Sequence, residues 1–355
     1  MSCRAALPDL PADLAGRIAA AADVNALAAL APQLRQAALA ALADDAGPAQ
    51  VTRLISALND LLSGRIVALA AARHRLPAAS WCWLSLGSEG RGEQTLATDQ
   101  DNGLLFSASS GAEARELRRL FLPFAAAVNA DLDACGIPLC TGKIMAGNPD
   151  WCLSLDEWRE RFFGWIRTPD PKALLNATIF FDFRALCGAD DLAATLRAYL
   201  TELAAGNDVF LRMLAANALD VAPPLGLLGD VVGEDAAGGR VDLKKFGSRL
   251  FVDAARVLAL AAGVPAVNTL ARLRGLAGQP RMPLAAEAEA AVQACLAVLR
   301  LRLEGQRNAL AQGMAADNLV DPAGLNDFDR RLLREALHQA RRLQTHLRLG
   351  FGIGN

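Results

Sequence analysis

The stretch from Trp81 to Phe106, WCWLSLGSEGRGEQTLATDQDNGLLF, constrains the fold more than any other part of the sequence. An apolar run at its start leads into a polar loop that contains glycine, and a second apolar run closes it. This order predicts a strand, a loop and a strand. Side chains two apart on a strand point to the same face, so Asp99 and Asp101, at the head of the second strand, should present their carboxylates side by side.

Two neighbouring carboxylates repel one another and lose hydration on a half-buried surface, unless cations lie between them. A divalent metal ion would fill that space. At the end of the first strand, Gly87 permits a close approach of the backbone and Ser88 supplies a hydroxyl, so this turn could donate hydrogen bonds to phosphate oxygens. The alternative is a polar hairpin loop whose acids are simply solvated.

The same residues carry a resemblance to a known family. Gly87-Ser88 followed eleven residues later by Asp-x-Asp resembles the signature of the polymerase-beta-like nucleotidyltransferase superfamily. The longer string GSEGRGEQTLATDQDN is more similar still to the branch of nucleotidyltransferases related to the uridylyltransferase of the nitrogen-regulatory protein PII. The resemblance covers roughly residues 80 to 350 and includes a helical domain that binds substrate in that branch.

The resemblance also implies a third acid on a later strand of the same sheet. Alternation in Asn176 to Leu186, NATIFFDFRAL, predicts such a strand, with Asp182 in its middle. An acid in so apolar a strand is costly to bury without a partner. We expect Asp182 to join Asp99 and Asp101 as a catalytic and metal-binding residue; the alternative is a structural ion pair between Asp182 and Arg184.

Further residues are expected to contact the nucleotide or the acceptor. The candidates for nucleotide binding are Gly87, Ser88, Arg91, Lys143 and Arg184. Glu93 could orient Arg91 by pairing with it, and Lys143 could contact either a triphosphate or only solvent. In the helical domain, Asp242, Lys244 and Arg249 are the candidates for substrate binding, although solvated charge at the start of a helix would explain them as well.

Composition limits the other possibilities. The chain has 355 residues, 53% of them apolar, and a formal charge of −2, so it can bury a substantial core and nothing global favours long nucleic acid. By this reading no apolar run reaches the ~18 to 20 residues that a membrane span needs, and the first residues lack the apolar core of a secretory signal, so we expect a cytoplasmic protein without a membrane partner. Seven cysteines without a CxxC pair are typical of reduced thiols; Cys135 and Cys140 could otherwise be bridged or metallated.

Apolar spacing of three and four residues predicts helices on both sides of the sheet. The fold class is therefore α+β: a small mixed sheet with a helical segment before it and a helical bundle after it. Domain limits are expected at 1–78, 79–190 and 191–355. Among the helices, one should begin at Pro48, shorter ones should cover 11–22 and 32–43, and Ser248 should cap another.

Together these features predict a metal-dependent nucleotidyltransferase. It would move a nucleoside monophosphate from a nucleoside triphosphate to a hydroxyl group and release pyrophosphate, with Mg²⁺, two ions by analogy, as cofactor. The acceptor could be a protein, as in PII modification, or a small hydroxyl compound, and the sequence does not choose between UTP and ATP. A regulatory module that binds nucleotide without turnover, and a purely helical scaffold, are the alternatives from other classes.

Overall fold

The computed structural model describes residues 12–44, 46–227, 229–233, 238–278 and 285–354. Contacts within the chain divide it into two compact units. The first takes in residues 1–46, 50–164 and 176–200, and the second takes in 47–49, 165–175 and 201–355. The first unit thus holds the N-terminal helices together with the sheet. The three-part division at residues 78 and 190 stays a prediction.

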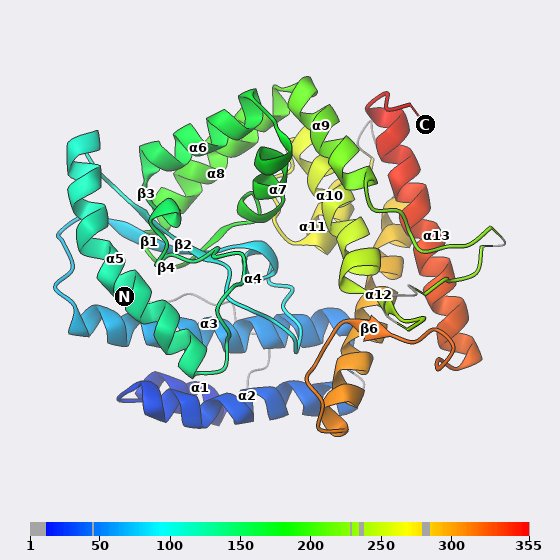
Figure 1. Ribbon diagram of the computed structural model, residues 1–355, viewed down its shortest axis with the longest axis horizontal. Helices are drawn as coiled ribbons and strands as arrows, with labels where there is room; N and C mark the ends of the chain where they lie inside the picture. The colour runs from blue at the N-terminus through cyan, green and yellow to red at the C-terminus, as the bar shows by residue number, and fades with distance from the viewer. Residues whose placement is uncertain (1–11, 45, 228, 234–237, 279–284, 355) are drawn as a thin grey trace. The chain divides into compact units, whose positions relative to one another are not determined.

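A four-stranded mixed sheet forms the centre of the first unit (Figure 1). Its order is β3-β2-β1-β4. The central strand β1 is antiparallel to both β2 and β4, whereas β2 and β3 are parallel. The strands are β1 (Trp81–Ser85), β2 (Asn102–Phe106), β3 (Cys152–Ser154) and β4 (Arg184–Gly188). The predicted α+β class, with a small mixed sheet between helical regions, is confirmed.

Eight helices lie in or border the described part of this unit. They are α1 (Ala12–Ala20), α2 (Val24–Ala43), α3 (Pro48–Arg73), α4 (Gly87–Arg91), α5 (Gly111–Ala134), α6 (Leu155–Arg167), α7 (Pro171–Phe180) and α8 (Asp190–Ala205). The long helix begins at Pro48, as predicted. The one before it begins earlier than predicted, at Val24, because Asp23 caps it by accepting a hydrogen bond from the Ala26 amide, and Pro32 lies inside it.

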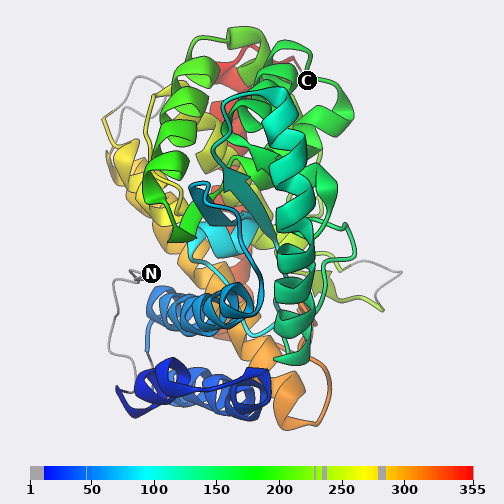
Figure 2. The same ribbon diagram turned by 90° about the vertical axis from the view of Figure 1, so that its left-hand side faces the viewer.

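One face of the sheet packs against the N-terminal helices and α5. Apolar side chains from α1, α2, α3, β1, β2 and α5 form a single buried cluster, which includes Leu27, Ile66, Trp83, Phe106 and Phe124. Figures 1 and 2 show α3 lying between the α1 and α2 pair and the sheet. Burial of this much apolar surface fixes β1 and β2 against a rigid layer of helices.

A second, aromatic cluster packs against β2. The indole of Trp158 on α6 donates a hydrogen bond to the Leu104 carbonyl over 3.1 Å, and its ring lies so close to Gly103 that an added Cβ would meet it at 3.2 Å. Trp151, Phe162 and the ring of Phe180 complete the cluster. The prediction that the aromatic helix 155–167 packs on the sheet is confirmed.

The predicted strand from Asn176 to Leu186 is wrong for its first half. Residues up to Phe180 belong to α7, which begins at Pro171, and the strand β4 begins at Arg184. Asp170 accepts a hydrogen bond from the Ala173 amide over 2.7 Å and so caps the helix. The aromatic run mimics strand alternation because it ends a helix whose side chains are buried in the aromatic cluster.

The second unit is helical, with a short two-stranded ladder. Its further elements are α9 (Asp208–Leu219), β5 (Val241–Asp242), a π-helical turn η3 (Lys244–Ser248), α10 (Arg249–Ala261), α11 (Thr269–Gly275), α12 (Ala285–Ala311), β6 (Leu319–Val320) and α13 (Asp327–Gly350). Ser248 takes the N-cap position of α10, as predicted, but its side chain makes no capping hydrogen bond. Its hydroxyl donates to the Leu243 carbonyl instead, because a π-helical turn precedes α10.

By length and composition alone, α2 and α3 would be able to cross a membrane, so the expectation that no such stretch exists was too strong. The core helix of a soluble protein passes the same test, and 56% of the most apolar window of α3 is buried inside the protein. These two helices are therefore weak evidence for a membrane span.

Candidate active site

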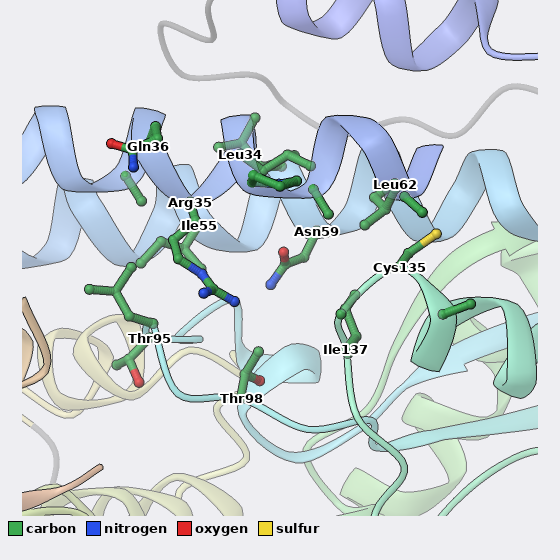
Figure 3. A pocket seen from close by; sticks show the side chains of 18 residues that line it. Leu34, Arg35, Gln36, Ile55, Asn59, Leu62, Thr95, Thr98, Cys135 and Ile137 are labelled. Atoms are coloured by element: carbon green, nitrogen blue, oxygen red, sulfur yellow. The ribbon is translucent and has the colours of Figure 1, made fainter. Parts of the chain in front are cut away.

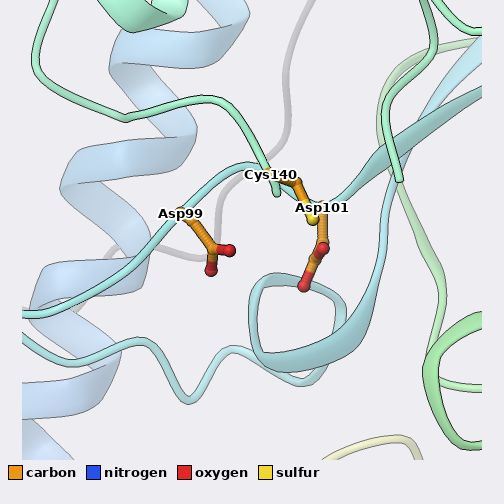
Figure 4. A group of neighbouring side chains, drawn as sticks. All are labelled: Asp99, Asp101 and Cys140. Atoms are coloured by element: carbon orange, nitrogen blue, oxygen red, sulfur yellow. The ribbon is translucent and has the colours of Figure 1, made fainter. Parts of the chain in front are cut away.

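Asp99 and Asp101 come together directly before β2, as predicted. Their carboxylates form one group with the thiol of Cys140, in which a donor atom of each residue lies within 4.8 Å of the others (Figure 4). Both acids are half-buried, while Cys140 is buried. The two carboxylates are adjacent and partly removed from water, so bringing a cation between them would relieve their repulsion.

The residues between and after these acids explain why the carboxylates point to one side. Gln100 and Asn102 are buried and face the opposite way, where the side chain of Asn129 on α5 donates hydrogen bonds to Gln100 Oε1 and Asn102 Oδ1, both over 2.9 Å. The Gln100 amide nitrogen in turn donates to the carbonyls of Asn129 and Ile137. A buried network of amide side chains therefore holds Gln100 and Asn102 on one side of the segment, so that Asp99 and Asp101 point to the other side, into the site.

The loop after α5 brings Cys140 to the acids. Its backbone accepts hydrogen bonds from the Gln100 and Asn102 amides, at the carbonyls of Pro138 (3.0 Å) and Ile144 (3.1 Å). These two hydrogen bonds fix the loop against the segment that carries the acids. The sequence offered Cys140 as a metal or disulfide partner of Cys135, and its place beside Asp99 and Asp101 was not predicted, although the glycine and proline residues around it did indicate a loop.

Gly87 lies against the carboxylate of Asp101. Its φ is +53°, and a Cβ added to it would meet Asp101 Oδ2 at 2.9 Å. The neighbouring Leu86 amide donates to the Asp101 carbonyl over 2.9 Å, which joins the two segments. Glycine is needed here for both the left-handed backbone and the close approach.

The predicted phosphate-binding turn is the start of the short helix α4. No side-chain hydrogen bond caps its first turn, and the Ser88 hydroxyl has no hydrogen-bond partner among the described residues. An uncapped first turn leaves amide donors for an acceptor from outside the chain. The roles of Gly87 and Ser88 in nucleotide binding stay predictions.

Glu89 is buried beneath the site and was missed at the level of sequence. Ser85 donates a hydrogen bond to its carboxyl group over 2.7 Å. Burial raises the pKa of Glu89 from 4.5 to about 8, a rise that the Ser85 hydrogen bond and Arg184 oppose and that Asp60 and Asp101 reinforce. Glu89 therefore holds a proton at neutral pH, and the only sequence signal was its place in the GSEGRGE string.

The Arg184 side chain has partners within the protein and helps to hold α4 in place. Its guanidinium donates to Asp60 Oδ1 on α3 over 2.6 Å and to the Glu89 carbonyl over 3.2 Å and 3.1 Å. Burial nevertheless raises the pKa of Asp60, against the lowering effect of Arg184. The assignment of Arg184 to nucleotide binding stays a prediction, and the geometry supports a role in holding α3, α4 and β4 together.

Asp182 is fully buried in the bend before β4. Its Oδ2 accepts a hydrogen bond from Arg91 Nη1 over 2.8 Å, and Arg91 Nε donates to Glu93 over the same distance. The expected pairing of Arg91 with Glu93 is confirmed. The alternative prediction, an ion pair between Asp182 and Arg184, is wrong, because Asp182 pairs with Arg91. The metal-binding role of Asp182 stays a prediction.

Two observations bear on that role. Among the described residues, the group of close donor atoms around Asp99 and Asp101 has Cys140 as its third member. Asp182 reaches α4 through its backbone as well, because a Cβ on Gly90 would lie 1.9 Å from the Asp182 carbonyl oxygen. Gly90 is therefore required for the close packing of the 182 segment against α4.

Lys143 is exposed and lies on the loop that carries Cys140. Its φ of +56° is unusual for a residue with a side chain. The Lys143 carbonyl accepts hydrogen bonds from Asn148 Nδ2 and Trp151 Nε1, both over 3.1 Å, which stabilise this turn. Contact between its ammonium group and a triphosphate stays a prediction.

The candidates for substrate binding belong to the second unit. Asp242 accepts hydrogen bonds from the amides of Lys244 (2.8 Å) and Lys245 (3.0 Å) and so organises the π-helical turn. Arg249 pairs with Asp253 over 3.0 Å. Asp242 and Arg249 thus have structural partners, the Lys244 side chain is exposed, and their roles toward a substrate stay predictions.

The donor atoms of the site fit magnesium. Mg²⁺ binds oxygen ligands and commonly uses one or two carboxylates together with substrate phosphates, which Asp99 and Asp101 can provide. A thiol suits softer metals. Burial, with smaller effects from Asp101 and Asp99, raises the pKa of Cys140, so this thiol stays protonated at neutral pH. Cys140 thus lines the site beside two oxygen donors, which suit Mg²⁺ better than its sulfur does.

The other described cysteines are also buried and form no disulfide bond: Cys82, Cys135, Cys152, Cys187 and Cys295. Burial raises the pKa of Cys82 and Cys152 to about 12 and that of Cys135 to about 11. A bridge between Cys135 and Cys140 is therefore not formed, and the interpretation of these residues as reduced thiols is confirmed; Cys3 lies outside the described residues.

Comparison with known proteins finds two family models that match successive parts of the chain. The sequence matches the family described as Putative nucleotidyltransferase DUF294 over residues 32–172. It matches the family described as Putative nucleotidyltransferase substrate binding domain over residues 208–351. The first match contains Asp99, Asp101 and Cys140, and the second contains Asp242, Lys244 and Arg249. Among proteins of curated function, none matches the sequence significantly.

Proposed function

Since the chain belongs to the nucleotidyltransferase family DUF294 and carries its C-terminal substrate-binding domain, we propose that it transfers a nucleoside monophosphate from a nucleoside triphosphate to a hydroxyl acceptor. Pyrophosphate is the second product. One observation carries the proposal: the carboxylates of Asp99 and Asp101 meet beside the Gly87 backbone and the start of α4. This places two oxygen donors next to backbone amides that phosphate oxygens can use.

Residues of this arrangement can bind the triphosphate and hold the metal ion that the proposed reaction needs. The triphosphate lies with its phosphate oxygens toward the first turn of α4, where the amides and the Ser88 hydroxyl donate hydrogen bonds to them. Asp99 and Asp101 are the residues that would hold Mg²⁺, which when bound neutralises phosphate charge and favours ionisation of the attacking hydroxyl. The acceptor oxygen forms a bond to the α-phosphorus, the bond from that phosphorus to the bridging oxygen breaks, and pyrophosphate leaves with the bridging oxygen.

Residues around the carboxylates keep this geometry fixed. The network of Gln100, Asn102 and Asn129 holds the backbone that carries both acids. The buried, protonated Glu89 of α4 adds no third negative charge. Arg91 retains slight exposure of its side chain, so it can reinforce phosphate binding while it stays paired with Asp182 and Glu93. Preorganised groups of this kind need little rearrangement during the reaction.

The proposal also gives the second unit a role. We propose that this helical unit binds the hydroxyl substrate, either a PII-like protein or a small hydroxyl compound, and that Asp242, Lys244 and Arg249 are its first candidates for contact. The match to a substrate-binding domain over residues 208–351 supports this. Asp182 is proposed as a third carboxylate of the site, which stays paired with Arg91.

The test is a product analysis with purified protein. Each of the four labelled nucleoside triphosphates is incubated with the protein, Mg²⁺ and a cell extract, and mass spectrometry searches for protein or small molecules that gain a nucleoside monophosphate while pyrophosphate release is followed. The proposal predicts one labelled acceptor and stoichiometric pyrophosphate. Calorimetry that shows Mg²⁺-dependent binding of a triphosphate, without either product, would instead support a regulatory module.

A further inference from the structure

A cavity of about 410 Å³ lies in the first unit, apart from the acids of the candidate active site (Figure 3). It is formed by α2, α3, the segment from Thr95 to Thr98 and the end of α5 with the residues that follow it. All of its lining residues belong to the first unit, and Asp99, Asp101, Cys140 and Gly87 are not among them. Its volume is within the range of small-molecule binding sites in proteins.

The walls of the cavity are mainly apolar. Alanine and leucine side chains from α2 and α3, with Ile137 beyond α5, make up most of the surface. Gln36, Asn59, Thr95 and Thr98 add neutral polar groups. A ligand in this space would bury an apolar body and find hydrogen-bond partners among these few groups.

Arg35 is the one charged residue among those that line the cavity. Its side chain reaches from α2 across the opening toward the segment that contains Thr95 and Thr98, as Figure 3 shows. Within the described part of the chain, the guanidinium has no hydrogen bond or ion pair. A guanidinium at the edge of an apolar cavity, with no carboxylate from the lining residues to balance it, attracts an anion.

We propose that this cavity binds a small organic anion, with an apolar body between α2 and α3 and a single carboxylate, sulfonate or phosphate group on Arg35. The shape and polarity of the lining agree with that chemistry. The apolar walls exclude water around the body of the ligand, and the exposed Arg35 receives the charged end. Neutral partners at Asn59 and Thr98 can accept or donate further hydrogen bonds.

The location gives this site a connection to the active site. Asn59 donates a hydrogen bond to Gln94 Oε1 over 3.2 Å, and Gln94 Nε2 donates to the Thr98 hydroxyl over 3.3 Å. Thr98 directly precedes Asp99. A ligand that contacts Asn59 and Thr98 therefore lies against the segment that positions the first of the two acids.

The experiment uses two fluorescent probes with the full chain. Anilinonaphthalene sulfonate has an apolar body and one anionic group, and phenylnaphthylamine has a similar body without the charge. Fluorescence titration of the wild type should give saturable binding of the sulfonate at one site. Replacement of Arg35 by glutamine should weaken the sulfonate roughly tenfold and leave the neutral probe within about twofold, since only the charged contact is lost.

Two further variants make the result specific. The control Arg53→Gln removes an exposed arginine of α3 that does not line the cavity, so sulfonate binding should stay at the wild-type level. Ala31→Phe adds a ring to the half-buried lining of α2 and should weaken both probes. Circular dichroism checks that each variant folds.

The proposal would be overturned by any of three results. These are the absence of saturable one-site binding in the wild type, equal loss of sulfonate binding in Arg35→Gln and Arg53→Gln, and unchanged binding of both probes in a folded Ala31→Phe variant. None of these readings depends on nucleotide transfer, so the result stands whether or not the proposed enzymatic activity is found.

Discussion

Arg91 Nη1 donates a hydrogen bond to Asp182 Oδ2 over 2.8 Å and so joins α4 to the bend before β4. The carboxylate of Asp182 is fully buried, while the Arg91 side chain keeps 12% of its exposure. A buried carboxylate that loses its cationic partner is strongly destabilising. The pair therefore connects the stability of the sheet to the helix that the nucleotide is proposed to contact.

Arg91→Leu should lower the free energy of unfolding by about 3 to 5 kcal/mol, because Asp182 is left buried without this partner. Asp182→Asn in the same chain should recover part of that loss, since the buried charge that lost Arg91 is then gone. Urea unfolding of the wild type, both single variants and the double variant gives the coupling energy. Strictly additive losses would show that the two side chains do not interact in solution.

Gly87→Ala should reduce nucleotide transfer by at least about a hundredfold, because an added Cβ meets Asp101 Oδ2 at 2.9 Å and moves the carboxylate. Gly92→Ala is the matched control. Gly92 has a similar backbone, with φ of +65° against +53°, but a Cβ there meets nothing within 4 Å. Both variants should lose similar stability, about 1 to 2 kcal/mol, and equal activity in the two would contradict the role given to Gly87.

Glu89→Gln should alter the dependence of stability on pH. The pKa of Glu89 is about 8 in the folded protein and ordinarily 4.5. Between pH 4.5 and pH 8 the folded protein therefore keeps a proton on Glu89 that the unfolded chain has released. Stability of the wild type that comes from this group is thus fully present below pH 4.5 and is lost as the pH rises through 8.

The glutamine of the variant stays neutral at every pH, so the variant does not lose stability through this group as the pH rises. The difference in free energy of unfolding, variant minus wild type, should therefore rise by on the order of a few kcal/mol between pH 5 and pH 9. Thermal or urea unfolding at both values measures the difference, with Glu160→Gln, which removes an exposed carboxylate, as the control. Parallel stability curves for wild type and Glu89→Gln would mean that Glu89 is ionised at neutral pH.

Asn129→Ala should cost about 2 to 4 kcal/mol of stability, because it removes the partner of Gln100 Oε1 and of the Gly147 amide, and one of the donors to Asn102 Oδ1. It should also weaken Mg²⁺ binding, since the backbone that carries Asp99 and Asp101 loses its support. Chemical unfolding and metal titration measure the two effects. Asn25→Ala, at an exposed position of α2, is the control, and a similar small loss in both would contradict the proposed network.

Much of this fold could be predicted from local patterns. Alternation and the two apolar runs around GSEGRGEQTLATDQDN predict β1 and β2, and the spacing of Asp99 and Asp101 predicts two carboxylates on one side, because the period of a strand is a local property. Long helices such as α3 and α5 follow from their apolar periodicity and from Pro48 and Gly136 at their limits.

The rest depends on contacts between distant segments. Nothing near Cys140 indicates that the loop after α5 pairs with Gln100 and Asn102, and nothing near Arg91 selects Asp182 as its partner 91 residues away. The strand predicted from Asn176 was wrong because an aromatic run suits a buried helix end as well as a strand. Tertiary packing decides such segments, and a short pattern does not contain it.

The central claim is that Asp99 and Asp101 form a metal-dependent site for nucleotide transfer, and Asp101→Asn tests it most directly. Pyrophosphate release is measured with Mg²⁺ and the preferred triphosphate for the wild type, for Asp101→Asn, and for the exposed control Asp156→Asn. We expect Asp101→Asn to lose transfer by at least about a thousandfold with a thermal midpoint within a few degrees of the wild type, and the control to keep full activity. Wild-type turnover in a folded Asp101→Asn variant would contradict the claim.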